Sequence, residues 1–318
     1  VEITGAIDGT AGSIVKTGAG TLILSGTTDN TALAAVANAG TLTLAKTSSA
    51  TVHAIGTGGL TINNTATVVI AGTGGDQIEN TVDLTVNTGG TLDLNDQTET
   101  IDELIGAGSV ILGTGTLTVG SNDGSSTFAG VISETGNLVK TGSGNFTLTG
   151  VNTYTGMTDL TEGTLTVDGQ IGNGGNPATN PVGALTIASG ATLSGSGIVN
   201  APIKSTTIGS NILATGDLRL GDGSNQGFDF DGVFTIGSNT VTIVDGNEGL
   251  LGRSTTIDGG VLIAANGLSM SIDDVLSGNG SIDSTLDVNS GTVTPGFDGG
   301  DSTQTLNIGS IVFGPNGT

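Results

Sequence analysis

The densest group of potential metal ligands lies between residues 221 and 232, in the sequence GDGSNQGFDFDG. Asp222, Asn225, Asp229 and Asp231 offer side-chain oxygens there, and Ca²⁺ prefers oxygen ligands. Their spacing matches neither an EF-hand loop nor the glycine-rich nonapeptide repeat that binds Ca²⁺. We therefore predict no cofactor and no metal site, with Ca²⁺ at this stretch as the alternative. Added Ca²⁺ should change the stability of the protein little.

Two pairs of carboxylates could serve an enzyme that acts on polysaccharide. Asp229 and Asp231 lie two residues apart, so on a strand they would share a face and could reach glycosidase-like separations. Asp273 and Asp274 form the second pair. The chain has one Tyr, two Arg and no Trp, which leaves few side chains to stack on sugar rings or to neutralise a uronate. The composition favours a non-enzymatic protein without catalytic residues, and the polysaccharide enzyme is the alternative.

The single histidine limits the remaining catalytic and metal chemistry. Any catalytic triad or histidine metal site would have to use His53, which lies in the alternating run TVHAI at residues 51–55. This pattern predicts a strand over 52–55 with a solvent-facing His53. The Lys-Thr pairs at Lys16 and Lys140 follow valine, whereas the lysine of a phosphate-binding loop follows glycine. These lysines therefore predict no nucleotide site.

The charge balance excludes several partners. The 318 residues carry 29 acidic and 6 basic side chains, for a net charge of −23. Such a surface repels nucleic acid and anionic membranes, and no apolar run approaches the roughly 18 residues of a membrane span. We predict neither nucleic-acid binding nor membrane insertion by this segment.

Short β-strands joined by glycine and small polar residues form the elements that must position these side chains. The stretch from Leu138 to Val167 contains three runs with a period of two, at residues 145–149, 157–161 and 163–167. Similar runs continue through the chain, with a strand or a loop at the Ala-rich stretch 31–37 and the more helix-like IDELI at 101–105. Phe228, Phe230 and Phe234 form the one local group of aromatic residues.

The same unit occurs twice. The sequence IVKTGAGTLILSG, which starts at Ile14, matches LVKTGSGNFTLTG, which starts at Leu138, 138 − 14 = 124 residues later. Gly-Thr-Leu or a close variant recurs mostly at intervals of about 19 to 31 residues. Self-similarity on this scale indicates a solenoid, a propeller or an array. A propeller would show an aromatic signature, which is missing here. We therefore predict an all-β, parallel β-helix whose rungs bury their apolar positions on one another.

Residues 92–167 resemble the autotransporter-associated β-strand repeat family. The resembling text is LDLNDQTETIDELIGAGSVILGTGTLTVG, followed by FAGVISETGNLVKTGSGNFTLTGVNTYTG and GTLTV. The Lys-Thr-Gly-x-Gly and Asn-Thr-Tyr-Thr-Gly pieces are the most specific. Residues 14–44 resemble a degraded second copy, and residues 185–203 and 228–312 resemble the spacer rungs of the family.

This resemblance implies a right-handed β-helix on the bacterial cell surface or outside the cell, usually without enzymatic activity. We accordingly predict one continuous β-helical domain over 1–318, with repeat copies near 12–44 and 136–167 and a protruding loop near 169–181. Both ends look like cuts in a longer protein. The predicted function is that of a structural or adhesive stalk or filament, whose partners are other copies of itself or other surface components. End-to-end assembly through uncovered terminal rungs is part of that prediction.

Overall fold

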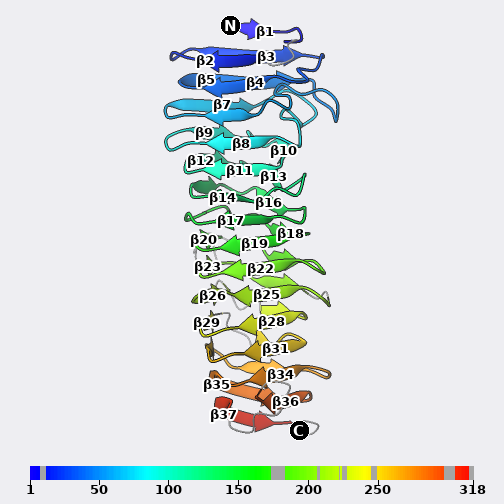
Figure 1. The fold of residues 1–318 in the computed structure, drawn as a ribbon, viewed down its shortest axis with the longest axis vertical. Coiled ribbons are helices and arrows are strands. Elements are labelled where there is room, and N and C mark those ends of the chain that lie inside the picture. The colour runs from blue at the N-terminus through cyan, green and yellow to red at the C-terminus, as the bar shows by residue number, and fades with distance from the viewer. Residues whose placement is uncertain are drawn as a thin grey trace. The chain divides into compact units, whose positions relative to one another are not determined.

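The fold of the chain, in a computed structural model, is a parallel β-solenoid (Figure 1). The structure describes residues 1–7, 12–172, 183–205, 208–221, 223, 228–244, 249–296 and 305–314. Every ladder between named strands among these residues is parallel, and the described residues form no helix. No helix among these residues is therefore long and apolar enough to cross a membrane. The predicted all-β parallel architecture is confirmed.

The chain divides into two units, Val1–Gly156 (unit 1) and Met157–Thr318 (unit 2). In unit 1 each rung contributes one strand to each of two sheets, and the later rungs contribute to a third sheet. The first sheet contains β1 (Glu2–Ile3), β3 (Thr21–Gly26), β5 (Gly40–Lys46), β7 (Ala66–Ile70), β9 (Thr91–Asp93), β12 (Ser109–Ile111) and β15 (Val131–Ser133). The second contains β2 (Ser13–Lys16), β4 (Ala34–Ala37), β6 (Leu60–Ile62), β8 (Asp83–Val86), β11 (Glu103–Gly106), β14 (Ser126–Phe128) and β17 (Asn145–Leu148). The third contains β10 (Thr98–Ile101), β13 (Thr116–Val119) and β16 (Asn137–Lys140).

Unit 2 has the same three-sided plan. One sheet contains β18 (Thr158–Leu160), β21 (Leu185–Ile187), β24 (Ile203–Ser205) and β27 (Phe228–Phe230). Another contains β19 (Thr164–Val167), β22 (Thr192–Gly195), β25 (Asn211–Ala214), β28 (Val233–Ile236), β31 (Ser254–Ile257), β34 (Val275–Gly278) and β36 (Thr292–Pro295). The last contains β20 (Gln170–Ile171), β23 (Ile198–Val199), β26 (Leu218–Leu220), β29 (Thr240–Ile243), β30 (Gly249–Leu250), β32 (Val261–Ala264), β33 (Leu268–Met270), β35 (Ser281–Val288) and β37 (Asn307–Phe313).

The period-two pattern of the sequence fills the core. Strands such as β13 and β19 alternate half-buried and buried residues, because successive side chains of a strand point to opposite faces. Parallel pairing in register then stacks the apolar residues of each rung on the apolar residues of the next. One buried ladder of unit 1 consists of Leu42, Val68, Leu92, Val110 and Ile132. In unit 2 the ring centroids of Phe228, Phe230 and Phe234 lie 6.0 to 6.3 Å apart, and all three rings are buried.

Three local predictions have different outcomes. Residues 34–37 of the Ala-rich stretch form β4 and residues 31–33 lie in the turn before it, while the IDELI pentapeptide contributes the end of β10 and the start of β11. The predicted strand at 52–55 is wrong, because this segment forms only isolated bridges within a loop. The predicted loop at 169–181 begins instead with β20, whose Ile171 is buried. Residues 173–181 lie outside the described residues.

Candidate functional site

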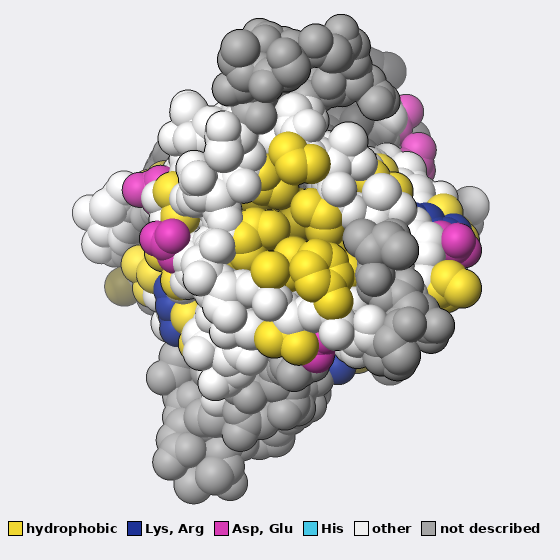
Figure 2. All heavy atoms as spheres, turned by 90° about the horizontal axis from the view of Figure 1, so that it is seen from below, with side chains coloured by type: hydrophobic (Ala, Val, Ile, Leu, Met, Phe, Trp, Pro, Cys, Tyr) yellow, Lys and Arg dark blue, Asp and Glu magenta, His cyan; other side chains and the backbone are white. Residues whose placement is uncertain are grey.

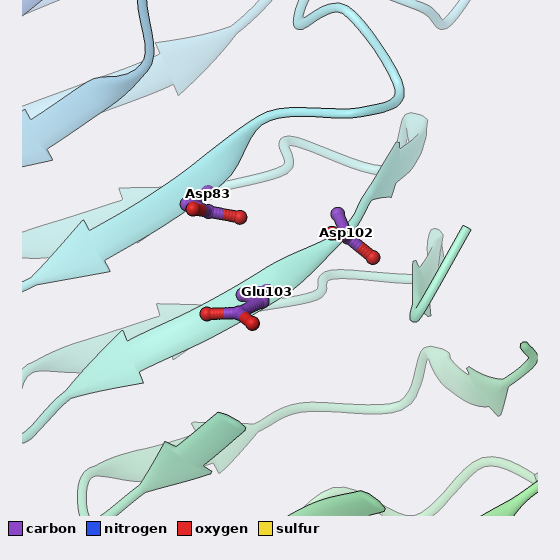
Figure 3. A group of neighbouring side chains, drawn as sticks. All are labelled: Asp83, Asp102 and Glu103. Carbon is purple, nitrogen blue, oxygen red and sulfur yellow. The ribbon is translucent and has the colours of Figure 1, made fainter. Parts of the chain in front are cut away.

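Three carboxylates of unit 1 meet on the outer side of the solenoid (Figure 3). Asp83 begins β8, Glu103 begins β11, and Asp102 immediately precedes Glu103. One carboxylate oxygen from each of these residues, which we call the acidic triad, lies within 4.8 Å of the other two. Asp83 and Glu103 come together because the parallel register of β8 and β11 pairs them directly.

The next rung holds two members of the triad in place. Asp102 is only 6% exposed, and its Oδ1 accepts hydrogen bonds from the backbone N–H groups of Asn122 and Gly124, each at 3.0 Å. Glu103 Oε1 accepts a hydrogen bond from the backbone N–H of Ser125 at 3.1 Å. The turn between β13 and β14 therefore fixes these two carboxylates, while Asp83 stays exposed.

The charges within the triad oppose one another. Burial raises the pKa of Asp83, and the neighbouring charge of Asp102 raises it further. Burial likewise raises the pKa of Glu103, with added repulsion from Asp83 and Asp102. Such an oxygen-only group suits a hard cation in ligand type, but three carboxylates supply fewer oxygens than the six to eight that Ca²⁺ takes. The other ligands would have to be backbone oxygens or water.

Replacing Asp83 by asparagine should stabilise unit 1. The substitution removes one of two like charges that face each other on neighbouring strands, a repulsion that costs about 0.2–1 kcal/mol. Urea unfolding should show the gain at low ionic strength and a smaller gain in 1 M NaCl, where screening acts over about 3 Å.

Asp123→Asn is the control for this prediction because it makes the same charge change elsewhere in unit 1. The backbone N–H of Ser143 donates to Asp123 at 2.6 Å, and this hydrogen bond lowers the pKa of Asp123. The control should therefore be destabilising. Two variants with the same sign would show that net charge, rather than the local repulsion, sets the result.

The sequence-based search missed the triad because its members lie in different rungs. Asp83 and Glu103 are 103 − 83 = 20 residues apart, so no local spacing motif contains both. The detectable signal was the recurrence of an acidic residue at one rung period, at the polar position that precedes an apolar residue. That signal becomes visible only when the rungs are aligned with one another.

Three of the carboxylates singled out in the sequence meet at a pocket of unit 2. Asp229 and Asp231 line a pocket of about 270 Å³ together with Asp274, Arg253 and the exposed side chain of Ile272. Burial raises the pKa of Asp274, and the charge of Asp231 contributes. The predicted Ca²⁺ ligands Asp222 and Asn225 lie outside the described residues.

The second predicted carboxylate pair is split between two environments. Asp274 is buried and accepts a hydrogen bond from the backbone N–H of Ser271 at 2.5 Å. Asp273 is exposed and lies 3.6 Å from Nη2 of Arg253. A raised carboxyl pKa beside a second carboxylate is what a general acid needs. The pocket nevertheless offers little sugar-stacking surface, because its one aromatic residue, Phe230, is buried.

Half of the basic residues point into the protein. Lys16, Lys46 and Lys140 are all buried, on inward-facing positions of their strands. Lys16 Nζ donates to the carbonyl oxygens of Gly18 at 2.7 Å and Ala39 at 2.8 Å. Lys140 Nζ donates in the same way to the carbonyls of Thr141 and Gly142. The lysine of the Lys-Thr-Gly-x-Gly motif therefore binds the backbone of its own corner, and the surface is left with few cations.

The prediction for His53 is wrong. The side chain is buried, and its two ring nitrogens face Asp29 and Asp76. The alternating pattern misled because residues 47–59 form a loop, in which side chains do not alternate between core and solvent as they do in a strand. Among the described residues, His53 does not join a cluster of three metal-ligating groups.

Comparison with known proteins relates this solenoid to the passenger repeats of autotransporters. The family described as the passenger-associated-transport-repeat matches residues 14–44 and 138–167, the two copies identified from the sequence. The adhesin BmaC autotransporter of Brucella suis biovar 1 (strain 1330) is 30% identical over 261 residues. This match covers 74% of the present chain and 7% of the adhesin, so the chain spans only a small part of that protein. No solved structure matches the chain significantly.

Proposed function

We propose that this chain, which belongs to the autotransporter passenger repeat family, is a non-enzymatic adhesive segment of a passenger displayed on the bacterial surface. The observation that supports this most is the similarity to an adhesin along 74% of the chain. The repeats and the parallel rungs fit a protein whose function is to present outer surface for contact. The match covers only 7% of the adhesin, so the transfer of adhesion from that protein to this segment is itself part of the proposal.

Surface display tests the proposal. The chain would be fused to an outer-membrane anchor in a non-adherent bacterium, and binding of these cells to cultured epithelial cells and to each other would be counted. We expect the displayed chain to increase at least one of the two over cells with the empty anchor. Cells that display the destabilised variant Gly144→Ala serve as a further control. Equal binding by all three strains would contradict adhesion.

A separate assay tests the proposal that the chain has no enzymatic activity. Purified protein is incubated with a panel of neutral and uronate-containing polysaccharides, and new reducing ends or unsaturated products are measured. We expect none above background. Product formation that disappears in Asp274→Asn and Asp231→Asn would instead assign the pocket of unit 2 to an enzyme acting on polysaccharide.

End-to-end assembly of two copies is the finer part of the proposal. The last described strand, β37, pairs with β35 through one edge and leaves Ile311, Val312 and Phe313 exposed. Figure 2 shows hydrophobic side chains gathered on the face seen from this end of unit 2. Burying apolar surface of this kind contributes about 25 cal/mol per Å², and an unpaired strand edge can accept a strand from another molecule.

Sedimentation over a concentration series tests assembly. We expect concentration-dependent dimers or larger species, favoured by salt because screening weakens repulsion between copies that each carry a charge of −23. Val312→Lys should abolish them, whereas Val15→Lys, which places a lysine at another exposed valine, should not. A protein that stays monomeric at all concentrations and salt levels would refute end-to-end assembly.

A further inference from the structure

The first rungs of unit 1 have loops where later rungs have the third sheet. These loops cover residues 27–33, 47–59 and 71–82, before that sheet begins at β10 (Figure 1). Backbone hydrogen bonds join them: Asn30 N–H donates to His53 O at 3.2 Å, and Ala54 N–H donates to Gln77 O at 2.8 Å. His53, at the centre of the middle loop, is 6% exposed.

The imidazole of His53 bridges the three loops. Its Nδ1 lies 3.5 Å from Asp29 Oδ1 in the loop before it, and its Nε2 lies 3.6 Å from Asp76 Oδ2 in the loop after it. Asp29 has further donors, since it accepts hydrogen bonds from the backbone N–H of His53 and from the hydroxyl of Thr31, each at 2.8 Å. Asp76 is less well supplied, because its Oδ1 is buried and has no hydrogen-bond partner.

Counting donors shows which protonation state fits this geometry. A doubly protonated imidazole has an N–H on each nitrogen, one for each carboxylate. A neutral imidazole has one N–H and one lone pair, so in either tautomer a lone pair faces a carboxylate oxygen. We propose that His53 is a proton-controlled latch, which in its charged form ties the three loops together through Asp29 and Asp76 and on losing one proton releases one of them.

The two carboxylates that face His53 interact with further charged groups. Among the described residues, the ionisable groups that act on Asp29 and Asp76, apart from His53, are Lys46, Glu79 and Glu99. Burial raises the pKa of Asp76, and the charge of His53 and a hydrogen bond from it partly offset this effect. Burial also tends to raise the pKa of Asp29, but the hydrogen bonds from His53 N–H and Thr31 and the charge of His53 outweigh it, so this pKa is lowered.

The latch should favour the closed loops at low pH. The closed loops bind a proton that the open loops hold less tightly, so the closed state is favoured at low pH and loses that advantage as the pH rises. The raised pKa of Asp76 acts in the same direction. The lowered pKa of Asp29 acts the other way, below its usual value of 3.8, where protonation would remove a partner of the histidine.

The latch can be observed directly because His53 is the only histidine of the chain. In full-length protein labelled with ¹³C-histidine, the single ring signal reports its titration by NMR. Hydrogen exchange then gives the protection factors of the Asn30, Ala54 and Ile55 amides over the same pH range. We expect protection to fall as the pH rises toward the midpoint of the ring titration, by at most about tenfold per pH unit, the slope for one proton. Protection independent of pH, or a loss of protection that lies wholly above the ring titration, would overturn the latch.

Three variants separate this mechanism from general charge effects. Asp76→Asn and His53→Gln should make the protection of the three loop amides independent of pH. Asp258→Asn, an equal charge change at an exposed residue of unit 2, should keep the wild-type dependence. A dependence that survives in His53→Gln, or disappears in Glu99→Gln instead, would assign the proton to another group. The wild-type comparison of protection with the ring titration remains decisive even if a variant fails to fold.

Discussion

Gly144→Ala should destabilise unit 1 by about 3 kcal/mol or more, whereas Gly20→Ala should change its stability by no more than about 0.5 kcal/mol. Both glycines end a Lys-Thr-Gly-x-Gly motif. A Cβ at Gly144 would lie 2.0 Å from Gly124 O and 2.6 Å from Asp123 O in the preceding rung. A Cβ at Gly20 would have no heavy atom within 4 Å. The obstacle at Gly144 is backbone, so the rungs themselves would have to move apart.

Urea unfolding followed by circular dichroism measures the effect, with hydrogen exchange at the strands on either side of the substitution. Exchange is needed because rungs interact mainly with their neighbours, and a local defect in a repeat protein can open without global unfolding. In Gly144→Ala the amides of β14 and β17 should lose protection. Similar stability of the two alanine variants would show that the rungs yield at this corner at little cost.

Glu99→Ala should be the second severe change, with a loss of about 2–6 kcal/mol from two buried N–H groups left without acceptors. Glu99 is fully buried in β10. Its Oε2 accepts a hydrogen bond from the backbone N–H of Gln77 at 3.0 Å, and its Oε1 accepts one from Ile78 at 3.2 Å. The Glu99 carboxyl thus accepts the hydrogen bonds of two loop N–H groups, in place of the carbonyls that a neighbouring strand would offer. Thermal and urea unfolding of unit 1 measure the loss.

The protonation of Glu99 adds a pH dependence. Burial raises the pKa of this carboxyl well above its usual value of 4.5, and the hydrogen bonds from Gln77 and Ile78 only partly offset this. The folded state therefore holds the proton more tightly than the unfolded state, so this contribution to stability is complete below the unfolded pKa and is lost as the pH rises through the folded pKa. Glu99→Gln cannot titrate and should lose this share of the pH dependence. An unchanged pH profile in Glu99→Gln would show that the carboxylate stays charged in the folded protein.

The sequence alone was sufficient for the fold class. Apolar residues at a period of two require strands, and turn residues between short runs limit their length. Repetition of the unit at residues 14–44 and 138–167 indicates stacking of like on like, which the parallel ladders confirm. The buried cluster of Phe228, Phe230 and Phe234 also follows from alternation along two strands. These features depend on neighbours close in the chain, and local patterns report them directly.

Features that depend on the adjacent rung came only from the tertiary structure. A backbone carbonyl of the preceding rung lies against Gly144, and the Lys-Thr-Gly-x-Gly motif alone does not reveal it. Asp83 meets Glu103, and His53 meets Asp29 and Asp76, across separations of about one rung. The physical reason is that a solenoid rung makes its decisive contacts with the rungs before and after it. Which residues face each other across two rungs depends on the strand register and on the loop lengths. The spacing of residues within one stretch of sequence does not give either of these.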